Sequence, residues 1–150
     1  MRRLLRVPIY LTRTDTRVSS LSLGVRAAMP CFILFTNVPT SDLPKGFLSE
    51  TSKIVAKAIR KPESLLEVRI HPGQMMSHGG TTEPCANSEL QAIGHISAEE
   101  NIQMSKEISE FLQQKLGIDP KRNYIKFTDM KPHELGCDGT TVEVLWSRKT

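Results

Sequence analysis

From residue 31 onward, the chain alternates between segments with the hydrophobic spacing of strands and segments with that of helices. The run CFILFTNV is apolar on both faces and rich in aromatic and β-branched residues, which predicts a central strand. Apolar residues then recur at helical spacing between Phe47 and Ile59, and Thr40, Ser41 and Asp42 offer side chains that cap a helix N-terminus. The segment LLEVRIH alternates as a strand with one buried face does. The first half therefore predicts strand, helix, strand.

The second half of this region repeats the pattern. ANSELQAI is a weaker strand candidate, and Ser97 with Glu100 forms a capping-box pattern ahead of a helix that closes at Gly117. The apolar positions of that helix are Ile102, Ile108, Leu112 and Leu116. NYIKFTDM predicts the next strand, and TTVEVLW predicts another after the turn at Cys137-Asp138-Gly139. Because KPESLLEVRI and DPKRNYIKFT follow the two helices in matching places, we infer an internal duplication of one βαβ unit.

A right-handed βαβ unit repeated once places both helices on the same face of one sheet. The predicted fold class is therefore α/β, a two-layer sandwich built from a duplicated βαβ unit. The other face of the sheet carries mixed polar and charged residues from the predicted strands, including the last one, TTVEVLW. These residues are Glu67, Arg69, Glu89, Gln91, Lys126 and Glu143. This face is either solvated or the site of oligomerisation around a polar centre, and the sequence leaves both interpretations open.

Charge divides the chain into two parts. Residues 1–28 hold six arginines, no lysine and one acid, so they carry a net charge of +5 within a chain whose net charge is +4. Residues 29–150 form the predicted domain. The leader is rich in Arg and Ser, as a mitochondrial transit peptide is, but sequence translated ahead of the true start has the same appearance. Both interpretations exclude 1–28 from the fold.

Several classes of function are excluded by the remaining residues. The basicity belongs to the leader and the domain has no basic stripe interleaved with aromatics, so we expect no nucleic-acid partner. No apolar run approaches the roughly twenty residues that cross a bilayer, so we expect no membrane span. The three cysteines and four histidines lack metal-ligand or disulfide-framework spacing, which predicts no metal and no disulfide framework.

Five segments carry a resemblance to a known family: MPCFILFTNVP, GFLSE, Lys61-Pro62, HGGTTEPCA and the end of FTDM. From Met29 to Val142 the chain resembles the macrophage migration inhibitory factor family of the tautomerase superfamily. The resemblance implies a homotrimer and a cofactor-free keto–enol tautomerase of the phenylpyruvate and dopachrome type. It also implies cytokine-like signalling through a cell-surface receptor. Members of the family leave cells without a signal peptide, which implies cytoplasmic and extracellular localisation, or mitochondrial targeting if the leader acts as a transit peptide.

The resemblance assigns catalysis to Pro30 and Lys61, because family members lose the initiator methionine and use the exposed proline as a general base. A free α-amino group titrates near pH 8, so desolvation or a nearby cation brings it close to neutrality. Lys61 matches the lysine that holds the substrate carboxylate. Inside an intact chain, by contrast, Pro30 is a tertiary amide without a basic lone pair. The position of the mature N-terminus therefore decides whether the chain is an enzyme.

Four further residues match pocket positions of the family. Ile93 matches a pocket wall whose backbone contacts the ligand, and Tyr124 matches an aromatic that reaches in from the neighbouring subunit. Lys126 stands where the vertebrate factor has asparagine, and Val142 where it has phenylalanine. Lys126 is either a second carboxylate anchor or, if it points away, a residue that covers the sheet face. The implied substrate is a small aromatic α-keto acid, bound in a more cationic pocket.

Two functions remain open from the sequence. The first is the tautomerase with Pro30 as base, and the second is a cytokine-like binding protein whose pocket is vestigial or blocked. A thiol–disulfide oxidoreductase is not expected. The vertebrate factor has a CxxC motif, but here the position three residues after Cys85 is Ser88, so the second thiol of such a motif is missing.

Overall fold

The computed structural model describes residues 29–148, so the transit-peptide and start-site interpretations of 1–28 lie outside the described residues. The strands of the main sheet are β1 (Cys31–Thr36), β2 (Glu67–His71), β3 (Ala86–Ala92) and β4 (Asn123–Asp129). The long helices are α1 (Phe47–Ala58) and α2 (Ala98–Leu116). Each predicted strand of the two βαβ units is present, and so are both predicted helices.

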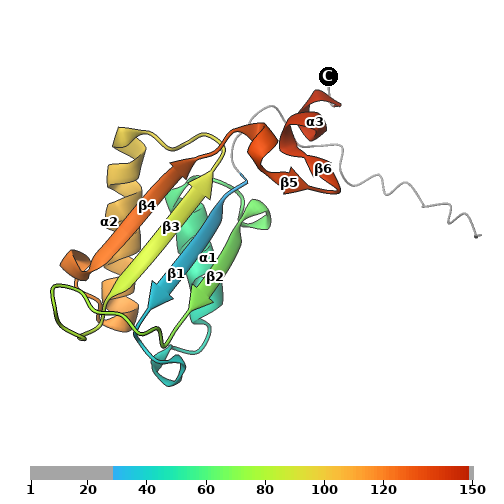
Figure 1. The fold of residues 1–150 in the computed structure, drawn as a ribbon. Coiled ribbons are helices and arrows are strands. Elements are labelled where there is room, and N and C mark those ends of the chain that lie inside the picture. Colours follow the sequence, from blue (N-terminus) through green and yellow to red (C-terminus); the bar gives the residue numbers. More distant parts are fainter. Residues whose placement is uncertain (1–28, 149–150) are drawn as a thin grey trace, which may run out of the picture.

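The four strands form one sheet in the order β2-β1-β3-β4. β1 is parallel to β2, β3 is parallel to β4, and the two central strands β1 and β3 are antiparallel. Both helices cover the same face of this sheet (Figure 1). The two-layer sandwich from a duplicated βαβ unit is therefore confirmed within one chain, and the opposite face of the sheet is uncovered.

The core lies between the sheet and the two helices. Alternate residues of β1 and β3 point into it, including Phe32, Leu34 and Leu90, none of which has exposed surface. The helices contribute Val55 from α1 and Leu112 from α2, which are also fully buried. Strand residues with the opposite parity lie on the uncovered face, as the two-residue period of a strand requires.

The predicted cap of the first helix is wrong. Thr40–Asp42 form a separate 3-10 helix, and α1 begins only at Phe47. The residue before α1 is Gly46, whose φ of 81° lies in the left-handed region that glycine adopts without steric cost. Residues 40–42 therefore form a turn of their own, and the chain turns again at Gly46 before α1 begins.

The start of α2 agrees with the sequence, whereas one of its predicted core positions does not. The Ser97 hydroxyl accepts a hydrogen bond from the Glu100 N–H at 3.2 Å, and the Glu100 carboxylate turns to His95 at 3.3 Å. Ile102 is 74% exposed, and Met104 takes the buried position at 1%. The buried face of the helix therefore begins at Met104 and continues through Ile108, and Ile102, two residues before Met104, lies on the exposed side.

The C-terminal segment forms a small unit of its own beyond the end of the sheet at which β1 begins (Figure 1). The strands β5 (Gly136–Cys137) and β6 (Thr140–Thr141) flank the predicted turn, in which Asp138 and Gly139 both have positive φ, as a type I′ hairpin requires. The strand predicted over TTVEVLW is therefore confirmed only for its first two residues, which form β6. The rest of the segment forms helix α3 (Val142–Ser147), which the Thr141 hydroxyl caps by accepting from the Val144 N–H at 3.4 Å.

None of the helices in 29–148 is long and apolar enough to cross a membrane.

Candidate active site

Pro30 stands directly before β1 and is almost completely buried. Its carbonyl accepts a hydrogen bond from the Glu67 N–H at 3.0 Å, which fixes the start of β1 against β2. In the chain as it stands, its ring nitrogen is acylated by Met29, so it has no basic lone pair. A pocket with Pro30 as base therefore requires cleavage of the peptide bond between residues 29 and 30.

Lys61 is held by the way in which α1 ends. The Lys61 N–H donates to the Ala56 carbonyl at 3.0 Å, and the Arg60 N–H donates to the Lys57 carbonyl at 3.1 Å. These two bonds form a Schellman motif, in which the residue after the helix adopts the left-handed conformation. That residue is Arg60, with φ of 56°. The helix end thus fixes the backbone from which the Lys61 side chain extends.

The charge of Lys61 is uncompensated within the described part of the chain. No ion pair joins it to any residue of 29–148, although four other ion pairs form there. The side chain is half-buried. An ammonium group without a carboxylate partner attracts anions of either kind, a carboxylate or a phosphate.

Ile93 follows β3 and is 6% exposed. The backbone on both sides of it is fixed, because the Ala92 carbonyl accepts from the Met130 N–H at 2.8 Å and the Gly94 N–H donates to the Asp129 carboxylate at 2.9 Å. A backbone held in this way presents the Ile93 peptide in one orientation.

The topology brings these three residues to the same end of the sheet. β1 begins there, the antiparallel β3 ends there, and Cys31 pairs with Gln91, which places Pro30 opposite Ala92 and next to Ile93. α1 returns the chain from the far end of β1, so Lys61 also lies at this end. All three residues were predicted from the resemblance, and the fold places them at the same end of the sheet.

Tyr124 and Lys126 lie elsewhere in the same chain. Both are on the uncovered face, since their parity on β4 matches that of Cys31 on β1, and Tyr124 is 68% exposed. Tyr124 stands four residues along the sheet from the row that contains Cys31, a separation of roughly 13 Å at about 3.3 Å per residue. These two side chains can complete a pocket at Pro30 only when a second chain supplies them.

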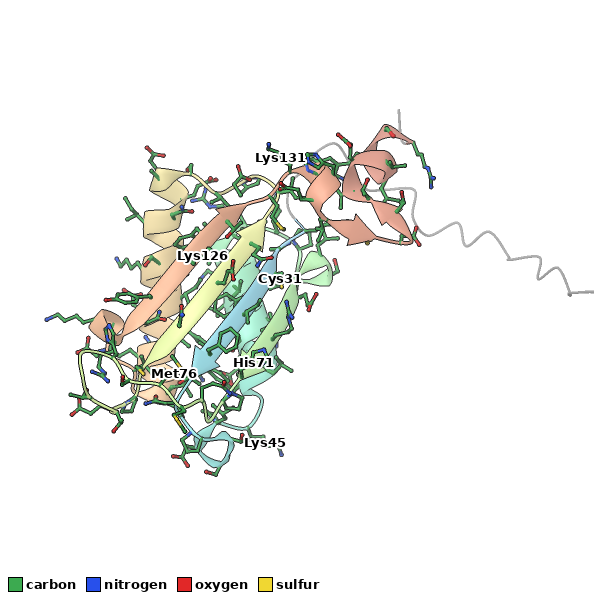
Figure 2. The ribbon with its side chains drawn as sticks, viewed as in Figure 1. Cys31, Lys45, His71, Met76, Lys126 and Lys131 are labelled. Carbon is green, nitrogen blue, oxygen red and sulfur yellow. The ribbon has the colours of Figure 1, made fainter. Side chains whose placement is uncertain are left out.

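Lys126 lies on β4, on the uncovered face of the sheet, and forms an ion pair with Glu89 of the neighbouring strand β3 (Figure 2 labels Lys126). The Lys126 Nζ atom lies 3.3 Å from the Glu89 carboxylate, which also accepts from the Thr128 hydroxyl at 3.2 Å. Burial alone would raise the pKa of Glu89, but hydrogen bonds from Gln91, Lys126 and Thr128 outweigh it and lower that pKa below the ordinary glutamate value. In the single chain, Lys126 therefore lies over the sheet face and is paired with Glu89.

Val142 has no exposed surface and lies inside the C-terminal unit, where its N–H donates to the Leu135 carbonyl at 3.0 Å. In this conformation of the single chain, the Val142 side chain is not accessible to a ligand. No cluster of three or more His, Cys, Asp or Glu suited to a metal occurs within 29–148.

The sequence did not identify the partner that holds Lys126. The alternation in ANSELQA placed Glu89 on the polar face, but its contact with Lys126 depends on the register between β3 and β4, which no local pattern reveals. Arg60 was also missed, because a left-handed arginine has no sequence signature and glycine is the usual residue at that position.

Comparison with known proteins identifies the domain. The family model described as macrophage migration inhibitory factor matches residues 29–143, one residue beyond the predicted end of the resemblance. The chain is 41% identical over 113 residues to the macrophage migration inhibitory factor of Rattus norvegicus, a match that covers 75% of this chain and 98% of the relative. It is 40% identical to the homolog from Trichinella spiralis, with coverage of 75% and 99%.

Solved structures agree with these matches. The macrophage migration inhibitory factor of Trichinella spiralis aligns with a TM-score of 0.71 at 39% identity, and the match covers 74% of this chain and 98% of that chain. The homologue from Prochlorococcus marinus aligns with a TM-score of 0.69 at 28% identity, with coverage of 75% and 98%. The protein belongs to the macrophage migration inhibitory factor family.

Proposed function

We propose that the domain is a cofactor-free keto–enol tautomerase of small aromatic α-keto acids, of the phenylpyruvate and dopachrome type, once Pro30 is the free N-terminus. One observation carries the proposal. A buried proline, a half-buried lysine without an ion-pair partner in 29–148 and a fixed backbone segment at Ile93 lie together at one end of the sheet.

The chemistry follows from these groups. The free secondary amine of Pro30 removes the proton from the carbon next to the keto group of the substrate, and the proton returns to the keto oxygen, which yields the enol. No electron is gained or lost, so the isomerisation itself requires no redox cofactor. Lys61 holds the carboxylate, and its charge together with burial disfavours the protonated amine, which lowers the pKa of the amine from about 8 toward neutrality. A base whose pKa lies near the working pH is the effective one.

The proposed active form is a homotrimer. Its support is that Tyr124 and Lys126 lie on the sheet face that the helices leave uncovered, and that Tyr124 stands roughly 13 Å along the sheet from the row next to Pro30. A neighbouring chain would bring these residues to the pocket and cover that face. Sedimentation equilibrium should give three times the chain mass. A monomer at micromolar concentration would remove Tyr124 and Lys126 from the site.

The test is the enol-to-keto conversion of phenylpyruvate by a chain that begins at Pro30. Pro30→Gly should lower kcat by a factor on the order of 10² to 10⁴, which is the usual contribution of general acid–base catalysis. Lys61→Ala should raise KM more than it lowers kcat. Lys57→Ala is the matched control, because Lys57 is an exposed lysine on the last turn of the same helix. Wild-type protein that converts no test substrate would end the enzymatic proposal.

A second candidate is a cytokine-like protein that acts on a cell-surface receptor with a blocked pocket. The observation that favours it is the bond between Met29 and Pro30, which abolishes the base while the fold remains intact. Family membership supports either role, in the cytoplasm or outside the cell. Signalling that persists in Pro30→Gly would favour this candidate, and signalling lost together with tautomerase activity would contradict it.

A further inference from the structure

His78 lies in the loop between β2 and β3, outside the set of residues that the sequence assigned to the site. Its backbone forms an isolated antiparallel bridge with Thr81, closed by two hydrogen bonds of 3.0 and 3.2 Å. Its ring packs against Tyr124, with the ring centroids 4.9 Å apart and the ring planes at 88°. This is the edge-to-face arrangement that aromatic pairs prefer.

Arg122 fixes the loop from the strand side. Its guanidinium donates to the carbonyl oxygens of His78 at 3.0 Å, Glu83 at 2.9 Å, Pro84 at 3.1 Å and Thr81 at 3.4 Å. Arg122 stands two residues before Tyr124. The segment that carries Tyr124 therefore also binds the backbone of His78, through Arg122.

The imidazole is placed by packing rather than by hydrogen bonding through Nδ1. That atom is buried and has no hydrogen-bond partner among the described residues. Tyr124, in contrast, is 68% exposed in the single chain, and its one ring–ring contact among residues 29–148 is the contact with His78. A freely rotating phenol would have to be ordered each time a ligand bound, at a cost in affinity that a fixed ring avoids.

We propose that His78 is a positioning residue for Tyr124: its ring holds the phenol in the one orientation in which it projects from the uncovered face toward the pocket of a neighbouring chain. The effect on catalysis rests on the proposed function, whereas the ring contact itself does not. His78 thereby sets the affinity for aromatic substrates without touching them.

The contact is tested in the full chain by nuclear magnetic resonance of ring-labelled tyrosine. The chain has two tyrosines, Tyr10 and Tyr124, and Tyr124→Phe identifies the signal that belongs to Tyr124. We expect a nuclear Overhauser effect between the rings of His78 and Tyr124 in the wild type. His78→Ala should move the Tyr124 ring signals toward those of a freely rotating ring, while His78→Phe and the exposed neighbour control Ser77→Ala should leave them close to the wild type. A wild-type spectrum without the effect would overturn the proposal, whether or not the variants fold.

The consequence is tested by kinetics on the chain that begins at Pro30. His78→Ala should raise KM for phenylpyruvate two- to tenfold with little change in kcat, and His78→Phe should restore it. In a Tyr124→Ala background, His78→Ala should have no further effect, because its action passes through that ring. An equal change of KM in both backgrounds would show a merely structural role and overturn the proposal. If the wild type has no tautomerase activity, the proposed function fails. The nuclear magnetic resonance experiment then still tests whether His78 positions the Tyr124 ring.

Discussion

Arg60 is the residue whose replacement tests how the helix end supports Lys61. It adopts a φ of 56° directly after α1, in the left-handed region that costs a residue with a β-carbon roughly 1–2 kcal/mol. Glycine avoids this cost but adds conformational entropy to the unfolded chain, worth about 0.5–1 kcal/mol. We therefore expect Arg60→Gly to raise the free energy of unfolding by about 0.5–1 kcal/mol.

The assay is urea unfolding followed by circular dichroism, with all variants at one protein concentration because an oligomer has a concentration-dependent midpoint. The control is Lys57→Gly, an exposed position inside the last turn of α1, where glycine costs about 1 kcal/mol. The same kind of substitution three residues apart should thus shift the midpoint in opposite directions. If Arg60→Gly lowers the free energy of unfolding while the slope of that free energy against urea concentration is unchanged, the assignment of strain to Arg60 is refuted.

Three further predictions concern stability. The folded-state pKa of Glu89 lies below the unfolded value of about 4.3, so its bonds stabilise the fold above that pH and lose effect as the pH falls through the folded pKa. The difference in unfolding free energy between wild type and Glu89→Gln should therefore be largest near neutral pH and shrink in acid. Lys126→Met should reduce this pH dependence without abolishing it, because Gln91 and Thr128 still donate to the carboxylate, and a difference that grows in acid would contradict the lowered pKa of Glu89. Met104→Ala should cost about 2–5 kcal/mol by urea unfolding, whereas Ile102→Ala, at a 74% exposed position, should cost less than about 1 kcal/mol. Ser97→Ala removes the cap of α2 and should cost about 1 kcal/mol, with Ser97→Asp restoring it.

The fold was predictable where a local pattern and a repeated pattern agreed. The strand CFILFTNV, the polar alternation of the next strand and the cap at Ser97 each follow from side-chain spacing. The start of α1 was not predictable in the same way, because Thr40–Asp42 have capping side chains but the turn at Gly46 intervenes. TTVEVLW has the alternation of a strand, yet it lies beyond the end of the main sheet and folds locally as a helix.

The candidate site divides along the same line. Pro30, Lys61 and Ile93 were identified by resemblance. The register of β1 and β3 explains why Pro30 and Ile93 lie at one end of the sheet, and the course of α1 explains why Lys61 lies at that end too. The contacts of Lys126 with Glu89 and of Tyr124 with His78 each join separate segments whose meeting depends on tertiary structure. No periodicity within one segment contains that information, so these partners emerge only from the folded chain.

The central claim is that a free Pro30 amine is the catalytic base, and the intact mass of the protein purified from its native source tests it most directly. The account predicts a mass that corresponds to a chain beginning at Pro30. A mass that includes Met29 or any of the residues before it would show that Pro30 remains an amide, and would contradict the assignment of Pro30 as the base.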